Sequence, residues 1–262
     1  MTTIRKSFLL SVAMIAATLA VAPSPARAQS DEIQVYDAAI TEKGKFNLMI
    51  HSNFIASGRK VADFPGGIIA DRSVNGTAEW AYGVTDWFEQ GLYLPVYTIY
   101  SKGRGGSING FKIRELFVLP HADDHKFFYG VNFEFSVNYN YWESRTITSE
   151  IRPIVGLHLH PVDIVFNPIM DTDYTGGFKD LDFVPSTRIA YNVNDKWAAA
   201  VEEYAGVGPF RHFLPGKEQF HEVWAVMNHS SKIVDIETGV GFGVTPGADK
   251  LTFKLMLSRD LN

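Results

Sequence analysis

Beyond residue 28, apolar and polar side chains alternate along the chain with a period of two. The clearest case is residues 127–141, in which every second side chain, starting with Phe127, is aromatic or aliphatic. The residues between them include Asn132, Glu134 and Asn138. A period of two is typical of a β-strand with one apolar face, and this run is much longer than the average strand of about 5–6 residues. The pattern predicts an all-β protein.

Twelve segments share this alternation, and their connections differ in length. The connections at one end are short, as at His160-Pro161 and Asn194-Asp195, whereas those at the other end are long, as at residues 57–72 and 207–218. An even number of strands with this asymmetry is typical of outer-membrane barrels. We therefore predict a twelve-stranded antiparallel up-and-down transmembrane β-barrel over residues 44–262. Its predicted strands are residues 44–56, 73–84, 87–100, 110–120, 126–140, 148–160, 162–171, 182–193, 196–206, 219–229, 232–243 and 249–261.

The first 28 residues have the features of a secretory signal peptide. Arg5 and Lys6 precede a nearly unbroken apolar run over residues 8–22, and Ala26-Arg27-Ala28 fits the small-x-small rule for cleavage. We predict that residues 1–28 are removed. Residues 29–43 are then expected to form a periplasmic N-terminal segment ahead of the barrel.

Composition excludes several other classes of protein. The chain has no cysteine, which excludes a disulfide scaffold, a thiolate metal site and a lipoprotein anchor on cysteine. Its formal charge of −5 provides no basic face for nucleic acid. The mean hydropathy is close to zero, so a bundle of membrane helices is not expected.

Alternation alone does not distinguish a membrane barrel from a soluble barrel or sandwich, because each places one face in an apolar environment. Aromatic residues at the strand ends favour the membrane, where they gather at the two interfaces. Beside the short turns we predict Tyr82, Trp87, Phe88, Phe127, Tyr129, Tyr191 and Trp197 as interface aromatics. Towards the long loops we predict Tyr97, Tyr100, Tyr139, Tyr141, Phe183, Tyr204 and Phe210.

The polar face of the predicted strands carries ionisable side chains far from the strand ends. A lumen that contains water accommodates such groups, so we expect them to line the interior and to set selectivity by charge. They can also brace a closed barrel through salt bridges. The predicted lumen-lining charged residues are Glu79, Glu134, Arg152, Arg188, Glu202, Glu237 and Lys254.

Two hairpins resemble a known family. Residues 80–95, with the sequence WAYGVTDWFEQGLYLP, and residues 189–197, with the sequence IAYNVNDKW, are similar to hairpins of the outer-membrane barrels grouped as the meta-pathway phenol-degradation family. Asp86 and Asp195 suit the tight turns. The resemblance implies an outer-membrane barrel that takes up apolar or aromatic compounds.

Histidines provide the main candidates for other chemistry. His121 and His125 flank two aspartates in a turn, and His158 and His160 share one face of a strand at the same end, so these four are weak candidates for a metal site. His51-Ser52-Asn53 invites comparison with a serine hydrolase. Neighbouring residues on a strand face opposite ways, however, so His51 and Ser52 do not pair directly. We expect no catalytic site and no cofactor.

The predicted function is a narrow channel or passive transporter for small solutes in the outer membrane of a Gram-negative bacterium. Twelve strands lie between the eight that side chains fill and the sixteen that leave an open channel. The expected partners are outer-membrane lipid, the barrel assembly machinery and a small-molecule solute, with no nucleic acid. Two alternatives are an outer-membrane hydrolase that modifies lipid and a soluble periplasmic barrel that binds a ligand.

Overall fold

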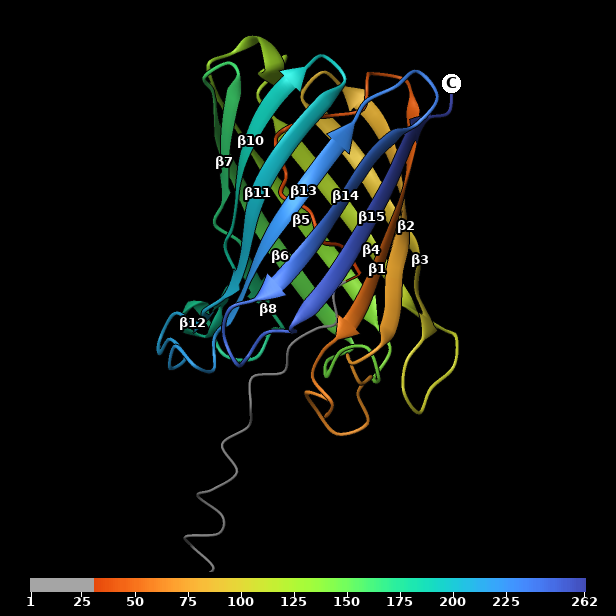
Figure 1. Cartoon of the computed structure of the whole chain (residues 1–262), viewed down its shortest axis with the longest axis vertical. Helices are drawn as coiled ribbons and strands as arrows, with labels where there is room; N and C mark the ends of the chain where they lie inside the picture. Colours follow the sequence, from red (N-terminus) through yellow and green to blue (C-terminus); the bar gives the residue numbers. More distant parts are fainter. Residues whose placement is uncertain (1–30) are drawn as a thin grey trace, which may run out of the picture.

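The computed structural model describes residues 31–262, and the predicted signal peptide lies outside the described residues. The chain forms a closed antiparallel barrel whose wall is twelve strands wide (Figure 1). The first strand pairs with the last, and β6 pairs with β7 to complete the ring. The strands are β1 (Phe46–Ser57), β2 (Ser73–Thr85), β3 (Phe88–Tyr100), β4 (Ser107–Val118), β5 (Phe127–Asn138), β6 (Ile147–His158), β7 (Val162–Asn167), β8 (Met170–Thr172), β9 (Asp182–Phe183), β10 (Ser186–Asn194), β11 (Trp197–Gly206), β12 (Gly208–Pro209), β13 (Phe220–His229), β14 (Asp235–Gly243) and β15 (Leu251–Asp260).

The two faces of the wall are those that the alternation predicts. On β5, the Phe133 and Phe135 side chains are 39% and 40% exposed, whereas Glu134 between them is 4% exposed. The outer surface is therefore apolar and the inner surface carries the ionisable groups. The prediction of an all-β, twelve-stranded antiparallel barrel is confirmed. Within residues 31–262, no helix has the length and apolar character needed to cross a membrane.

The barrel has two unlike ends. At one end, which we call the turn end, β2 and β3 are joined by two residues, and β10 and β11 also by two. At the other end, the loop end, the connections include residues 58–72 and 210–219. The turn end is at the top of Figure 1, where the C-terminus also lies.

Three neighbouring strands are interrupted near the loop end. The predicted strand over residues 162–171 is divided into β7 and β8, and the one over residues 182–193 into β9 and β10. In the third, Val207 separates β11 from β12. Pro168 and Pro185 lie at the first two of these breaks and lack the backbone N–H that a continuous ladder needs. The wall nevertheless stays hydrogen-bonded here, because Val184 N donates to Ile169 O at 3.0 Å and Ala205 N donates to Pro185 O at 2.9 Å.

Glycines on the inner face make room for large aromatic side chains. Phe128 pairs across the β5–β6 ladder with Gly156, and a Cβ atom on Gly156 would lie 2.0 Å from the Phe128 ring. Trp224 lies over Gly241 of β14 in the same way, at 2.1 Å from such a Cβ atom. Both aromatic side chains are fully buried, so the glycines allow the rings to lie flat on the wall.

We expect Gly156→Ala to lower the free energy of unfolding by about 1–3 kcal/mol, since the added methyl group overpacks the space that the Phe128 ring fills. Urea unfolding of the refolded protein in detergent measures this change. Gly177→Ala is the matched control, because nothing lies within 4 Å of a Cβ atom at Gly177. Equal stability of the two variants would contradict the packing role of Gly156.

Candidate functional site: the lumen

The N-terminal segment, residues 31–42, passes through the interior of the barrel. Asp31, Ile33, Val35 and Tyr36 are each at most 8% exposed. The segment leaves the interior at the turn end, where Lys43 forms a bridge with Gly83 of β2, and it is the red chain inside the barrel in Figure 1. The sequence predicts a periplasmic segment over residues 29–43. The structure differs, because the apolar side chains of residues 31–42 gain buried contacts inside the barrel.

Side chains of the wall hold the main chain of this segment. Lys254 Nζ donates to Ile33 O, and an Arg152 guanidinium nitrogen donates to Gln34 O, both at 3.1 Å. Asn53 of β1 donates to Asp31 O at 3.1 Å. Three strands of the barrel therefore contact three successive parts of one extended chain.

Tyr36 is the most extensively bonded residue of the segment. Its backbone N–H donates to Asn167 Oδ1 at 2.8 Å, and its backbone oxygen accepts from Asn167 Nδ2 at 2.9 Å. Its hydroxyl lies 2.5 Å from that of Tyr93 on β3. Closer to the turn end, Thr41 N donates to Glu89 Oε2 at 2.6 Å. The segment is thus fixed along its length.

The acidic side chains of the segment pair with basic groups of the wall. Lys112 Nζ lies 2.8 Å from an Asp31 carboxylate oxygen, and an Arg152 nitrogen lies 3.4 Å from one of Glu32. Burial strengthens such pairs because water screens them less. Ion pairs and main-chain hydrogen bonds therefore both hold residues 31–34 against the wall.

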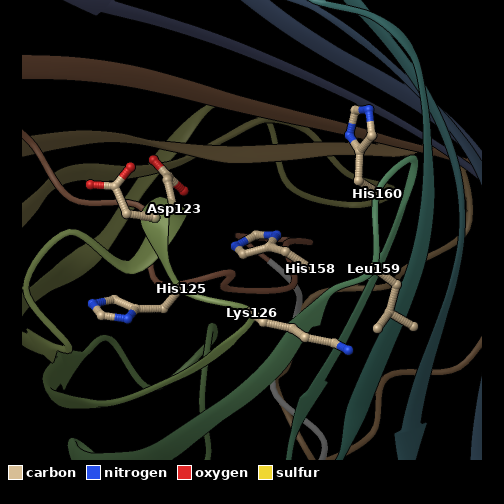
Figure 2. Close-up of a pocket in the computed structure, with 7 residues that line it drawn as sticks. Asp123, His125, Lys126, His158, Leu159 and His160 are labelled. Carbon is tan, nitrogen blue, oxygen red and sulfur yellow. The ribbon is translucent and has the colours of Figure 1, made fainter.

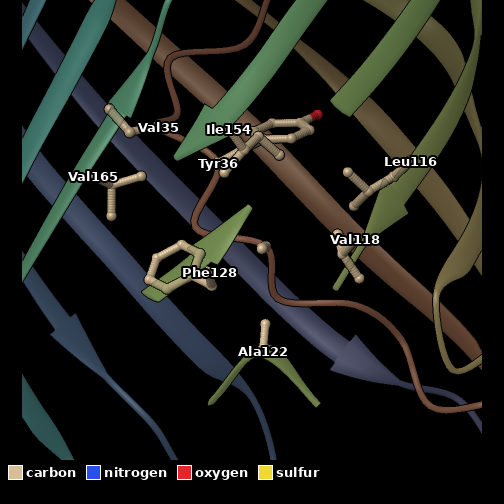
Figure 3. Close-up of a cluster of buried hydrophobic side chains, with 9 residues drawn as sticks. Val35, Tyr36, Leu116, Val118, Ala122, Phe128, Ile154 and Val165 are labelled. Atoms are coloured by element: carbon tan, nitrogen blue, oxygen red, sulfur yellow. The ribbon is translucent and has the colours of Figure 1, made fainter. Parts of the chain in front are cut away.

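The turn-end half of the lumen is filled by apolar side chains. Val35 and Tyr36 of the segment pack with Leu116, Phe128 and Ile154 of the wall (Figure 3). At the loop end, two connecting loops also fold over the interior. There Ile68 N donates to Tyr141 O at 2.9 Å, and Ile68 and Trp142 pack on Tyr93 and Val96 of β3.

One group of lumen ions lies on β1 to β4. Arg114 Nη2 lies 2.9 Å from Glu79 Oε1 and also forms an ion pair with Glu89. The other oxygen of Glu79 lies 3.0 Å from His51 Nε2. These buried charges therefore compensate one another, as buried charges must.

Neighbouring ion pairs extend this group onto β5 and β6. Glu134 lies 3.6 Å from Lys112, and Arg152 lies 2.6 Å from Glu150. Since Lys112 and Arg152 also bind the segment, these pairs connect the wall ions with it.

A second group of ions lies on β10, β11, β14 and β15. Lys254 Nζ lies 2.6 Å from Glu202 and 2.7 Å from Glu237, and its side chain is fully buried. Arg188 forms ion pairs with the same two carboxylates, the one with Glu237 at 3.4 Å. The Tyr204 hydroxyl donates to Glu202 at 2.7 Å. The lumen thus contains a compact four-ion cluster beside the segment.

The structure places all seven predicted charged residues on the inner face, where they join these two groups. These two groups also contain ionisable residues that are not among the predicted ones, namely Glu89, Lys112, Arg114, Glu150 and His51. On β4 the sequence does not show clearly which face is the inner one. The inner face carries Lys112 and Arg114 but also the apolar Leu116. The outer face carries Ile113 but also the charged Glu115.

Most predicted interface aromatics lie on the outside of the barrel. Tyr82, Trp87, Tyr129, Tyr139, Tyr191 and Trp197 are exposed, and Phe88 and Tyr141 are half-buried. Tyr204 is a correction to the predicted loop-end aromatics. It faces the lumen because it lies two residues from Glu202 on β11, and both side chains therefore share one face.

The four candidate histidines lie at the turn end. His158 Nδ1 is 2.8 Å from Asp163 Oδ1, and the His158 ring stacks on Phe128. His125, His158 and His160 line one shallow pocket with Asp123 (Figure 2), and His121 precedes the short 3-10 helix η1 (Ala122–Asp124). Over residues 31–262, no group of three or more histidine or acidic side chains is arranged to hold a metal ion.

The His51-Ser52-Asn53 stretch is divided between the two faces of β1. His51 and Asn53 are buried on the inner side, and Ser52 points the other way. The imidazole of His51 pairs with Glu79. His51 and Ser52 therefore do not form a nucleophile and base pair.

Solved structures of outer-membrane proteins are similar to this chain. A crystal structure of an outer membrane channel from Pseudomonas putida F1 is similar with a TM-score of 0.58 and 13% identity, over 88% of this chain and 100% of that one. LpxR from Salmonella typhimurium has a TM-score of 0.42 and 10% identity, over 81% and 99% of the two chains. At 13% identity, the similarity to the Pseudomonas putida channel shows the fold alone.

No protein-family model matches the sequence. No curated protein is a significant match. The resemblance to the meta-pathway phenol-degradation family therefore stays a prediction.

Proposed function

We propose that the protein is an outer-membrane channel that passes small solutes through a narrow lumen. The observation that carries this proposal is an apolar outer wall around an inner face that carries two groups of ionisable side chains. An outer wall of this kind suits lipid, and an inner face of this kind suits a path that contains water. The proposal includes assembly of the barrel into the outer membrane of a Gram-negative bacterium by the barrel assembly machinery.

The N-terminal segment makes the passage narrow. It occupies the middle of the lumen, and the ion pairs on both sides fix the surrounding side chains. We therefore expect small, discrete conductance steps from the full-length protein. Single-channel recording in planar bilayers measures them, and heat-modifiable migration on a gel shows that the protein used is folded. Folded protein without conductance steps would contradict the channel function.

The solute class is a further part of this proposal. The family resemblance implies apolar or aromatic compounds, and the inner face of the barrel carries the aromatic side chains of Tyr93, Tyr204 and Trp224. Swelling of proteoliposomes in an aromatic solute that the bilayer excludes, such as benzenesulfonate, compared with an aliphatic sulfonate of similar size, tests this class. Equal swelling rates in the two solutes would contradict the proposed preference for aromatic compounds.

The lumen should favour cations, because acidic side chains outnumber basic ones on its inner face and on the segment. We expect Glu134→Lys to move the reversal potential in a salt gradient towards anions, since it reverses a charge beside Lys112. Asp86→Lys makes the same charge change in an exposed turn and serves as the control. Equal reversal potentials in the two variants would mean that Glu134 does not face the conducting path.

A further inference from the structure

The wall of the lumen recognises the N-terminal segment largely through its main chain. Asn53, Arg152 and Lys254 each donate to a backbone carbonyl, and Asn167 bonds both the N–H and the oxygen of Tyr36. Main-chain contacts of this kind do not depend on the identity of the bound side chains. They are the usual basis on which proteins bind extended peptides.

The same wall also selects for acidic side chains. Lys112 binds the Asp31 carboxylate, and Arg152 binds the Glu32 carboxylate while donating to Gln34 O. The hydroxyl of Tyr93 meets that of Tyr36. The site therefore fits an extended chain with acidic residues at one end and an aromatic hydroxyl a few residues further on.

These wall groups are buried, and their contacts with the segment cannot be lost without a replacement. Asn53, Asn167 and Lys254 are each at most 2% exposed. A buried donor that loses its partner is destabilising. A lumen without the segment thus favours water or another chain that offers carbonyl and carboxylate oxygens.

We propose that the lumen is a binding site for extended acidic peptides, and that residues 31–42 are its tethered occupant. A free peptide of the same chemistry displaces the segment and takes the same contacts. This inference rests on the proposed function in one respect only, because a solute must be able to reach the lumen.

The test uses the full chain with Val35→Cys, because the protein has no other cysteine and Val35 is 4% exposed. Tyr36→Ala is added to weaken the tethered segment, since a tethered ligand competes at an effective concentration in the millimolar range. The probe is a synthetic peptide with the sequence of residues 31–42, DEIQVYDAAITE. The rate at which a water-soluble maleimide labels the introduced thiol reports displacement. Heat-modifiable migration verifies that the variant is folded.

We expect saturating peptide to raise the labelling rate about tenfold. The bound peptide increases the fraction of molecules in which the segment is displaced, and only in those molecules is the thiol accessible to the maleimide. A peptide with the corresponding amides in place of all its acidic residues should compete at least about tenfold less well, since it lacks the charges that Lys112 and Arg152 bind. A peptide methylated on the backbone nitrogen of its tyrosine should also compete less well, because it lacks the N–H that donates to Asn167. Val61→Cys, at a loop position that is 78% exposed, should label at the same rate throughout.

Unchanged labelling at every peptide concentration in the folded variant would overturn the proposal. Equal competition by the uncharged peptide would overturn the selection for acidic chains. Displacement by the peptide in a protein that shows no conductance would support the binding site and contradict the channel function, so the two failures are distinguishable.

Discussion

Replacing Gly83 with valine should dislodge the N-terminal segment and raise the single-channel conductance about threefold or more, because a lumen freed of an ordered chain conducts better. A Cβ atom on Gly83 would lie 2.3 Å from the backbone oxygens of both Thr41 and Glu42. Backbone atoms cannot rotate away as the tip of a side chain can, so the segment itself must move. The change also disturbs the bond from Gly44 N to Gly83 O, which is 2.7 Å long.

The matched control is Gly105→Val, at a glycine in a long loop with nothing within 4 Å of its Cβ position. It should conduct like the unmodified protein. The Val35→Cys reporter distinguishes two explanations of a negative result. If Gly83→Val leaves both the conductance and the protection of the reporter thiol unchanged, the segment is not held at Gly83. If the reporter thiol becomes accessible and the conductance stays the same, the segment does not limit conduction.

The second large effect should come from Lys254→Met, which we expect to lower the free energy of unfolding by about 3–5 kcal/mol. Lys254 is fully buried, and it neutralises Glu202 and Glu237 while donating to Ile33 O. Methionine keeps most of the length of the side chain and removes the charge. It leaves two carboxylates with only Arg188 to compensate them, and it also removes one bond to the segment.

Urea unfolding in detergent, followed by tryptophan fluorescence, measures this loss. Trp224 is a suitable reporter because its ring lies 5.5 Å from Lys254 Nζ. Lys45→Met is the control, since Lys45 pairs with Glu42 in an exposed position. The double variant with Glu202→Gln should recover part of the lost stability. A Lys254→Met protein as stable as the Lys45→Met protein would show that the cluster does not support the barrel.

Much of the wall could be predicted from the sequence because a membrane barrel places a different solvent on each face. Phe133 and Phe135 face the apolar outside and Glu134 faces the interior, so their alternation in the sequence reflects those two environments. Strand positions therefore agree with the structure to within a few residues at most ends. The same rule, applied strictly, also places Tyr204 inside, because Glu202 lies two residues before it on the same strand.

The N-terminal segment could not be predicted in the same way. Ile33, Val35 and Tyr36 are too few to establish a period, and the segment has no regular secondary structure over most of its length. Its position depends largely on contacts with β6, β7 and β15, which are distant in the sequence. A short polar linker and a lumen segment have similar sequences, and only the tertiary partners distinguish them.

The direct continuation of the segment into β1 constrains the order in which the protein assembles. Lys43 is followed within three residues by the first strand, and that strand pairs with the last one, β15. Formation of the β1–β15 seam is thus the step that encloses residues 31–42. A chain that sealed this seam too early would have to thread its N-terminus through a mouth already narrowed by Ala122 and Phe128. Biogenesis therefore favours inward folding of the segment before the cylinder is sealed.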